Sequence, residues 1–186
     1  MKKILITGPS GQLGASLQLN NYNIIRTDII LQDDQLHFKV LDITNEEQVN
    51  ALLEKEKPDV IIHLAAMTNV DGCERNPNQA QLINVLGTEN LLNHFTGKFI
   101  FVSSDYVFDG EDGPYTEDDD VNPINVYGKT KLEGEASVRK LSNDWVILRT
   151  NVVWNIGGNF KASFADWVVD ELQSNRHIQI VADQWN

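Results

Sequence analysis

Tyr127 and Lys131 lie four residues apart in the stretch NVYGKTKLEGE (125–135), which predicts a helix. Residues at positions i and i+4 share one helical face, so the lysine ammonium can lie beside the tyrosine hydroxyl. An ammonium stabilises a phenolate and would lower the pKa of the phenol from its ordinary value of about 10 toward neutrality. Such a tyrosine can donate a proton to the oxygen that forms when a carbonyl group is reduced. The spacing alone is equally compatible with a surface contact.

Two serines, Ser103 and Ser104, end the apolar run KFIFVSS (98–104), which predicts a strand. Ligands of parallel sheets bind beyond the carboxyl ends of the strands, so a serine at this end can hydrogen-bond a substrate oxygen beside the tyrosine. The alternative is that both serines are ordinary polar residues of a strand end.

Three glycines, Gly8, Gly11 and Gly14, lie in TGPSGQLG, between the first predicted strand and the helical ASLQL. A turn without side chains lets backbone N–H groups approach a pyrophosphate, and the helix N-terminus adds a favourable dipole. We therefore interpret the glycines as positions that let a cofactor pyrophosphate reach the backbone N–H groups. The spacing G-x-x-G-x-x-G differs from the G-x-G-x-x-G of most dehydrogenases, so an ordinary tight turn is the alternative.

Asp28 ends the second predicted strand, 20 residues after Gly8. An acidic residue at this place accepts hydrogen bonds from an adenosine ribose. Its carboxylate repels a 2′-phosphate and favours NAD, whereas Arg26 could face that phosphate in NADP. A strand-end aspartate without such a role is the alternative. The order of strand, glycine turn, helix, strand and acid predicts a dinucleotide cofactor, either NADPH or NADH.

Short runs rich in isoleucine and valine alternate with helical periodicity and predict buried parallel strands. These runs are KILIT (3–7), NIIRTD (23–28), FKVLD (38–42), DVIIHLA (59–65), KFIFVSS (98–104), DWVILRT (144–150) and IQIVA (178–182). The alternation predicts an α/β fold with a doubly wound parallel sheet of the Rossmann type, forming one dinucleotide-binding domain over residues 1–186.

Several local patterns predict how the helices begin and pack. Thr44 and Glu47 are placed like a capping box for a helix that Pro58 stops. Gly128 either leaves room beside the predicted helix for a bound cofactor or has no particular role. The acidic segment DGEDGPYTEDDDVNPIN (109–125) has no period and predicts a solvated loop. Two apolar stripes predict helix faces that pack in the core: Ala80, Ile83, Gly87 and Leu91, and Phe160, Phe164, Trp167 and Val168.

Composition excludes several classes of function. The formal net charge of −12 over 186 residues argues against binding to nucleic acid or to an anionic membrane surface. Cys73 is the single cysteine, so no intrachain disulfide forms, and MKKILITG becomes polar too soon for a signal peptide or a membrane span. The four histidines show no ligand-like spacing, so we expect no metal site. A cytoplasmic enzyme or binding protein is favoured.

Five stretches together resemble the extended short-chain dehydrogenase/reductases, most closely the dTDP-4-dehydrorhamnose reductase-like sugar-nucleotide reductases. They are GPSGQLG, SSDYVFDG, PINVYGKTKLEGE, LRTNVVW and DQWN, and the similarity runs through the whole chain. The resemblance implies that Ser104, Tyr127 and Lys131 form the catalytic set, with a serine where the family usually has a threonine. It also implies reduction of the 4-keto group of a deoxy-sugar nucleotide with NADPH or NADH, and it leaves a homodimer open.

The same resemblance implies binding residues by position. For the cofactor they are Gly8, Gly11, Gln12, Leu13, Gly14, Asp28, Asp42, Ile43, Ala65, Ala66, Tyr127 and Lys131. For the substrate they are Ser104, Asp105 and Tyr106.

Two departures from the family weaken the assignment of the substrate. Val152 stands in RTNVVW (149–154) where rhamnose-forming reductases tend to have an aromatic residue of the sugar site. The sequence also stops at DQWN, where the family continues into a C-terminal lobe over the sugar nucleotide, so we expect a substrate lobe after residue 186 that this chain lacks.

Two alternative functions remain open. One is a sugar-nucleotide epimerase or dehydratase, although a dehydratase typically has Asp-Glu where this chain has Asp105-Tyr106. The other is a cofactor-binding regulatory subunit similar to that of methionine adenosyltransferase.

Overall fold

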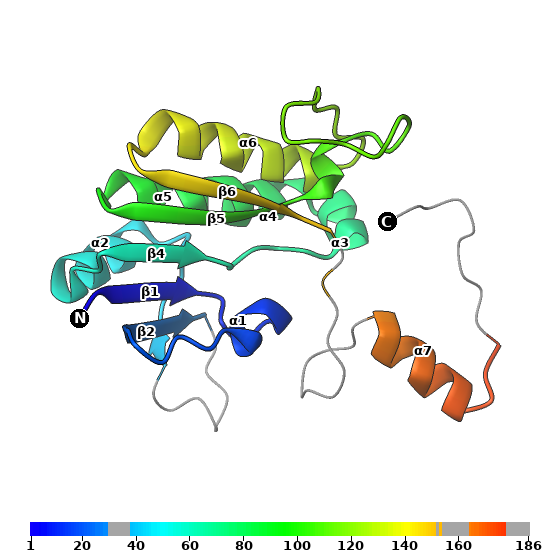
Figure 1. Ribbon diagram of the computed structural model, residues 1–186, viewed down its shortest axis with the longest axis horizontal. Helices are drawn as coiled ribbons and strands as arrows, with labels where there is room; N and C mark the ends of the chain where they lie inside the picture. The colour runs from blue at the N-terminus through cyan, green and yellow to red at the C-terminus, as the bar shows by residue number, and fades with distance from the viewer. Residues whose placement is uncertain (30–37, 152, 154–163, 178–186) are drawn as a thin grey trace.

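The structure is a computed structural model that describes residues 1–29, 38–151, 153 and 164–177. Six strands form one parallel sheet in the order β3-β2-β1-β4-β5-β6 (Figure 1). This is the strand order of a doubly wound dinucleotide-binding fold, so the predicted fold class is confirmed.

The strands lie where the apolar runs predict them, and β3, β4 and β6 are shorter than predicted. Their bounds are β1 (Lys3–Thr7), β2 (Asn23–Asp28), β3 (Lys39–Val40), β4 (Val60–His63), β5 (Lys98–Ser104) and β6 (Trp145–Thr150). The predicted strand at 178–182 lies outside the described residues.

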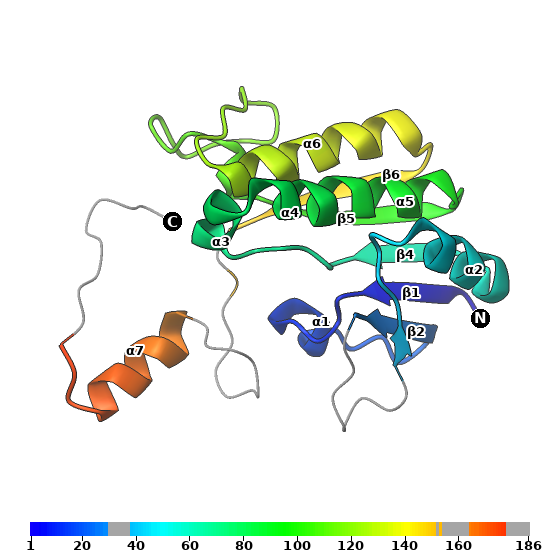
Figure 2. The ribbon, with the colours of Figure 1, turned by 180° about the vertical axis from the view of Figure 1, so that it is seen from behind.

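Helices follow most strands and cover one face of the sheet. The helices are α1 (Gln12–Ser16), α2 (Glu46–Glu56), α3 (Val70–Arg75), α4 (Pro77–Gln81), α5 (Gly87–Asn93), α6 (Val126–Leu141) and α7 (Phe164–Gln173), with the π-helical η2 (Leu82–Leu86) and the 3₁₀-helical η3 (Asp105–Val107). Because α4, η2 and α5 follow one another without a break, they form a single rod. Figure 2 shows this rod, α2 and α6 in front of the sheet.

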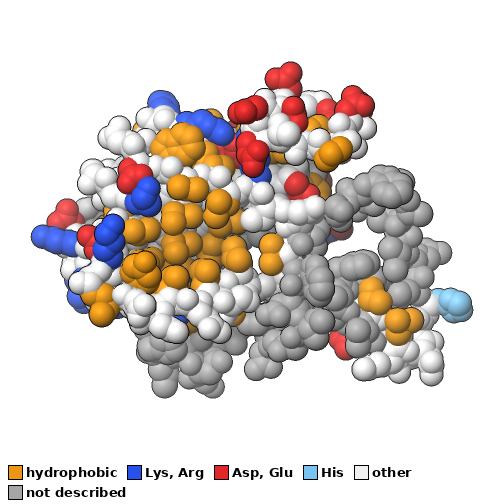
Figure 3. Space-filling view, viewed as in Figure 1, with side chains coloured by type: hydrophobic (Ala, Val, Ile, Leu, Met, Phe, Trp, Pro, Cys, Tyr) orange, Lys and Arg blue, Asp and Glu red, His pale blue; other side chains and the backbone are white. Residues whose placement is uncertain are grey.

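The face under these helices forms the main core, with Leu5, Ile61, Phe99 and Phe101 fully buried. On the opposite face, Val146 and Leu148 of β6 are 37% and 45% exposed. Figure 3 shows apolar side chains gathered over the strands on that side. The described residues thus pack one face of the sheet under helices, while on the other face Ile4, Ile6 and Val60 form a smaller buried cluster and the β6 side chains lie at the surface.

The capping box predicted for α2 is wrong. Asn45 is the N-cap, and its side chain accepts a hydrogen bond from the Gln48 N–H at 3.0 Å. Thr44 instead donates from its hydroxyl to the Asp42 carboxylate at 2.7 Å. Asn and Thr are both favourable N-cap residues, and here the hydrogen bond to Asp42 keeps the Thr44 hydroxyl from capping the helix.

The first predicted helical stripe is confirmed and the second lies partly outside the described residues. Ala80, Gly87 and Leu91 are buried along the rod, and Ile83 is half-buried. Helix α7 begins at Phe164, and Phe160 is not among the described residues.

The acidic segment 109–125 is a loop, as predicted, but it is held in place by its own contacts. The Phe108 and Tyr115 rings stack with centroids 4.4 Å apart, and Tyr115 donates from its hydroxyl to the Asp109 carboxylate. Asp109 also accepts a hydrogen bond from the Asn122 amide at 3.1 Å. The hydrogen bonds to Asp109, of which the one from Tyr115 has the largest effect, lower its pKa to about 2.

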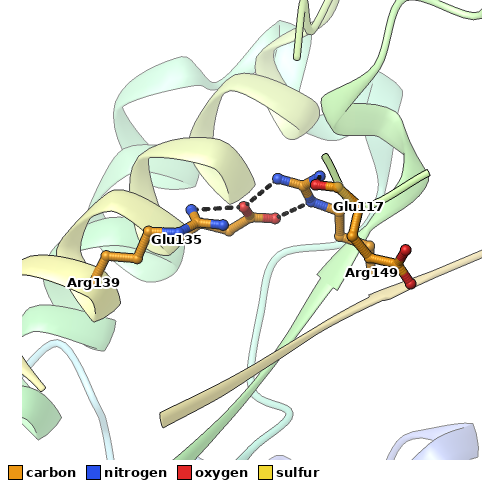
Figure 4. A network of polar contacts seen from close by, with 4 residues as sticks. All are labelled: Glu117, Glu135, Arg139 and Arg149. Atoms are coloured by element: carbon orange, nitrogen blue, oxygen red, sulfur yellow. Dashed lines mark hydrogen bonds and ion pairs between the residues drawn. The ribbon is translucent and has the colours of Figure 1, made fainter. Parts of the chain in front are cut away.

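A buried ion-pair network joins this loop to α6 and β6 (Figure 4). The Glu135 side chain is 0% exposed and accepts two hydrogen bonds from Arg149, at 2.9 Å from Nε and 2.8 Å from Nη2. Arg139 adds a third at 3.0 Å, and Arg149 also donates to the Glu117 carbonyl at 3.2 Å. The network therefore fixes the loop that precedes the Tyr127 helix.

Candidate active site

A cleft of about 1110 Å³ opens at the carboxyl ends of the strands. All the site residues predicted from the sequence line it: Gly8, Gly11, Gln12, Leu13, Gly14, Asp28, Asp42, Ile43, Ala65, Ala66, Ser104, Asp105, Tyr106, Tyr127 and Lys131. Parallel strands end at a common edge, so residues distant in sequence meet in one site. Their individual roles stay predictions.

The three glycines of the first turn serve different purposes. A Cβ at Gly8, whose φ is +66°, would lie 2.7 Å from the Ala65 backbone, and a Cβ at Gly14 would lie 2.4 Å from Pro9 Cα. A Cβ at Gly11 would meet nothing closer than 3.7 Å. Close packing thus requires glycine at positions 8 and 14. The prediction that all three glycines serve to let a cofactor phosphate approach the backbone is wrong, and this explanation fits Gly11 alone.

Asp28 connects the end of β2 to the glycine turn. Its carboxylate accepts hydrogen bonds from the Ser10 N–H at 3.3 Å and the Ile29 N–H at 2.8 Å. It faces the cleft from the strand next to β1, where a ribose-binding acid is expected. Arg26 is not among the described residues that line the cleft.

Ser104, Tyr127 and Lys131 meet on the side of the cleft formed by β5 and α6. Ser104 is buried, donates from its hydroxyl to Asp105 Oδ1 at 2.9 Å and accepts from the Tyr106 N–H at 3.2 Å. The Tyr106 and Tyr127 rings meet edge to face with centroids 5.8 Å apart. The hydroxyl and the phenol therefore approach the same part of the cleft from two elements.

The predicted effect of Lys131 on Tyr127 is wrong for this structure. Burial raises the pKa of Tyr127 to about 12, the neighbouring Ser104 hydroxyl opposes the rise, and the negative charge of Asp105 adds to it. Desolvation of the phenolate therefore dominates, and the phenol stays protonated at neutral pH.

Lys131 is buried, with 4% of its surface exposed, and its Nζ lies 4.1 Å from the centre of the Phe101 ring. Burial lowers the pKa of Lys131 to about 7, although the Glu135 carboxylate one turn later acts in the opposite direction. The amine therefore gains or loses its proton close to neutral pH, which gives the site a second group able to take part in proton handling.

The start of α6 packs closely against the segment that carries Asp105 and Tyr106. A Cβ at Gly128 would lie 2.1 Å from the Tyr106 carbonyl oxygen. Glycine at this position is therefore neither incidental nor a matter of access to the cofactor, since it lets α6 approach η3. Asn125 caps the helix by accepting from the Gly128 N–H at 2.7 Å.

We expect Gly128→Ala to lower the free energy of unfolding by about 1–3 kcal/mol, because backbone atoms must move to admit the methyl group. This strain outweighs the gain of up to about 1 kcal/mol that alanine gives in a helix. Denaturant unfolding measures the change, with Lys129→Ala at the next, exposed position as the control for helix propensity. Equal or higher stability of Gly128→Ala would show that the contact does not constrain the helix.

Sequence reasoning missed several polar residues that line the cleft. Thr7, Thr68, Thr150 and Asn151 all do so. Each lies at or just after the carboxyl end of β1, β4 or β6, and this position is the signal that could have found them.

Two further features are absent from the described residues. No group of three or more His, Cys, Asp or Glu side chains is placed to hold a metal ion in that part of the chain. None of the described helices combines the length and the apolar character needed to cross a membrane.

Known proteins resemble this chain over its full length. A dTDP-4-dehydrorhamnose reductase from Aggregatibacter actinomycetemcomitans is 39% identical over 189 residues, which are 99% of this chain and 62% of the relative. Methionine adenosyltransferase 2 subunit beta from Xenopus tropicalis is 36% identical over 192 residues, which are 99% of this chain and 56% of the relative.

A solved structure agrees in fold. That of a dTDP-4-dehydrorhamnose reductase from Bacillus anthracis, in complex with NADP, matches with a TM-score of 0.80 and 35% identity over 94% of this chain and 61% of that one. The chain thus spans about 60% of the length of these proteins. The family model described as the RmlD substrate binding domain matches residues 1–186, and the chain belongs to that family.

Proposed function

We propose that the protein to which this chain belongs reduces the 4-keto group of a deoxy-sugar nucleotide with NADPH or NADH. The observation that carries the proposal is the single cleft shared by two groups of residues. The glycine turn and Asp28 lie at the ends of β1 and β2, and Ser104, Tyr127 and Lys131 lie on β5 and α6. A hydride donor and a carbonyl substrate can therefore occupy adjoining parts of one site.

The residues present fit a dinucleotide. Gly11 leaves open space where a side chain would stand, and no side chain caps the N-terminus of α1. The Asp28 carboxylate lines the cleft, where it would accept hydrogen bonds from a ribose and would favour NADH by charge, whereas the Bacillus anthracis relative was solved with NADP. The reduced nicotinamide would supply the hydride when bound.

The chain's own residues would supply orientation and the proton. Ser104 would orient the carbonyl oxygen, and Tyr127 would donate the proton, since its raised pKa keeps the phenol protonated at neutral pH. Lys131, whose pKa of about 7 keeps part of it charged there, would support the phenolate that remains and hold the cofactor ribose. Asp105 and Tyr106 would contact the sugar.

The full-length protein should oxidise NADPH or NADH when a dTDP-linked 4-keto-6-deoxy sugar is added, with one cofactor consumed for each substrate reduced. Absorbance of the reduced nicotinamide and analysis of the sugar product measure this stoichiometry. Turnover that recycles the cofactor would instead support an epimerase.

The second candidate function is that of a regulatory subunit, which binds the cofactor without turnover. It is favoured by the 36% identity to methionine adenosyltransferase 2 subunit beta. Calorimetric titration with NADPH and NADH, followed by a panel of 4-keto sugar nucleotides, separates the two candidates. Tight binding with no cofactor oxidation on any sugar would favour the regulatory role.

A cytoplasmic location and a homodimeric state belong to the same proposal and rest on the sequence and its resemblance. Cell fractionation and light scattering of the full-length protein test them.

A further inference from the structure

A chain of buried hydrogen bonds crosses the core behind the cleft, through residues that the proposed reaction does not use. His63, at the end of β4, is 2% exposed. Its Nδ1 lies 2.6 Å from Thr7 Oγ1, and its Nε2 lies 3.1 Å from Thr88 Oγ1. The imidazole thus bridges the last residue of β1, next to Gly8, and helix α5.

The donors and acceptors of this chain can be assigned in one direction. The Thr88 hydroxyl donates to the Asn84 carbonyl at 2.7 Å, so it accepts from His63, whose Nε2 must carry the proton. His63 Nδ1 is then an acceptor for the Thr7 hydroxyl, which in turn accepts from the Ala65 N–H at 3.4 Å. A neutral imidazole in one tautomer satisfies every group.

The chain continues from Asn84 to the helix of the candidate proton donor. The Asn84 amide donates to Thr130 Oγ1 at 2.9 Å and to the Met67 carbonyl at 3.1 Å, and it accepts from the Met67 N–H at 2.8 Å. The Thr130 hydroxyl in turn donates a hydrogen bond to the Tyr127 carbonyl at 2.9 Å. Hydrogen bonds therefore run from the glycine turn, through His63 and the π-helical segment, to the turn of α6 that carries Tyr127.

The surroundings of His63 keep it in this form. The rings of Phe99 and Phe101 lie with centroids 5.8 Å from the imidazole, and the nearby charged group is Lys131. Burial, with the Lys131 charge added, lowers the pKa of His63 to about 3. An imidazolium would carry a proton on Nδ1 as well, so the Thr7 hydroxyl would have to rotate and accept from it, and its own proton would lose Nδ1 as an acceptor.

We propose that His63, as the neutral Nε2–H tautomer, is a positioning residue that sets the glycine turn and the Tyr127 helix at a fixed separation. Its catalytic consequence rests on the proposed function, because the separation matters for turnover only if a cofactor on the turn reacts with a substrate beside Tyr127. A misplacement of about 1 Å between reacting groups can cost about a hundredfold in rate.

Nitrogen-15 NMR of the histidine rings in the full-length protein tests the tautomer without any ligand, with His63→Gln identifying the resonances. We expect a protonated Nε2, an unprotonated Nδ1 and no titration between about pH 5 and pH 9, given the pKa of about 3. A proton on Nδ1, or titration near the ordinary histidine pKa of about 6.5, would overturn the assignment.

Thr88 tests the positioning role without removing the imidazole. We expect Thr88→Val to lower kcat about tenfold with little change in KM and to shift the Tyr127 resonances, because the link from His63 to Asn84 is lost. Thr88→Ser, which keeps the hydroxyl, should restore both. Val49→Ala, a buried substitution in α2 that creates a cavity away from the cleft, is the control for a general loss of stability.

The positioning role would be refuted if Thr88→Val had the same kcat as the Val49→Ala control and left the Tyr127 resonances unshifted. If the unmodified protein reduces no 4-keto sugar nucleotide, the proposed function fails, and the shift of the Tyr127 resonances in Thr88→Val still decides this inference.

Discussion

Tyr127→Phe is expected to lower kcat for carbonyl reduction by about a thousandfold, while the dissociation constant of the reduced cofactor changes by less than about threefold. A positioned proton donor contributes about 10²–10⁴-fold to a rate, and phenylalanine keeps the ring contact with Tyr106 while removing the proton. Single-turnover kinetics with cofactor already bound measure the chemical step.

The control for this substitution is Tyr22→Phe, which removes the same hydroxyl from a side chain that is 45% exposed. Its kcat should equal that of the unmodified protein. Near-normal turnover by Tyr127→Phe would assign proton donation to another group. Lys131 would be the next candidate, because burial brings its pKa to about 7.

Arg149→Met is expected to lower the free energy of unfolding by about 3–5 kcal/mol at neutral pH. The substitution leaves the buried Glu135 carboxylate with only the half-exposed Arg139 as an ion-pair partner, and removing one partner from a buried charge is costly. It also removes the guanidinium that lies 5.1 Å from the Phe108 ring and holds the Glu117 carbonyl, so the loop before α6 should loosen. Chemical denaturation and hydrogen exchange of residues 109–125 measure the two effects.

The pH dependence of this loss has a definite sign. Burial acts to raise the pKa of Glu135, yet its hydrogen bonds to Arg149 and Arg139 leave it below the ordinary value of 4.5. A lowered folded-state pKa contributes stability that is present above the unfolded pKa and disappears as the pH falls through the folded value. The gap between Arg149→Met and the unmodified protein should therefore shrink as the pH falls below about 4.5.

Lys98→Met is the matched control for Arg149→Met, because it breaks an ion pair with Asp144 in which the two side chains are 43% and 55% exposed. Exposed pairs contribute about 0–1 kcal/mol, so this variant should change stability little. A similar loss from both variants would mean that burial does not govern the strength of the Glu135 network.

Local patterns in the sequence predicted the sheet and the glycine turn because their causes are local. Alternation of apolar strands and helices requires a parallel sheet, and parallel strands present their carboxyl ends at one edge. Residues predicted from different motifs, such as Gly11, Asp28 and Tyr127, therefore line the same cleft. The capping prediction failed because two adjacent residues could cap α2, and the position of Asp42 decided between them.

The protonation states at the site depended on three-dimensional packing. The i and i+4 spacing correctly placed Tyr127 and Lys131 at one cleft, but it suggested a lowered phenol pKa, whereas burial raises it to about 12. Desolvation depends on every atom around a group, and those atoms come from β5, η3 and α6 rather than from the helix alone.

The sequence by itself determined the fold class and brought Gly11, Asp28 and Tyr127 to one cleft, because both follow from periodicity and from the geometry of parallel strands. The tertiary structure alone decided why Gly8 and Gly128 are glycines, since their constraint is a backbone approach from another segment. It alone placed His63 between Thr7 and Thr88 and Glu135 between Arg149 and Arg139. Apart from the Glu135–Arg139 pair, which is one helical turn apart, these contacts join residues 14 to 56 positions apart, and such pairings are specified by packing rather than by a local pattern.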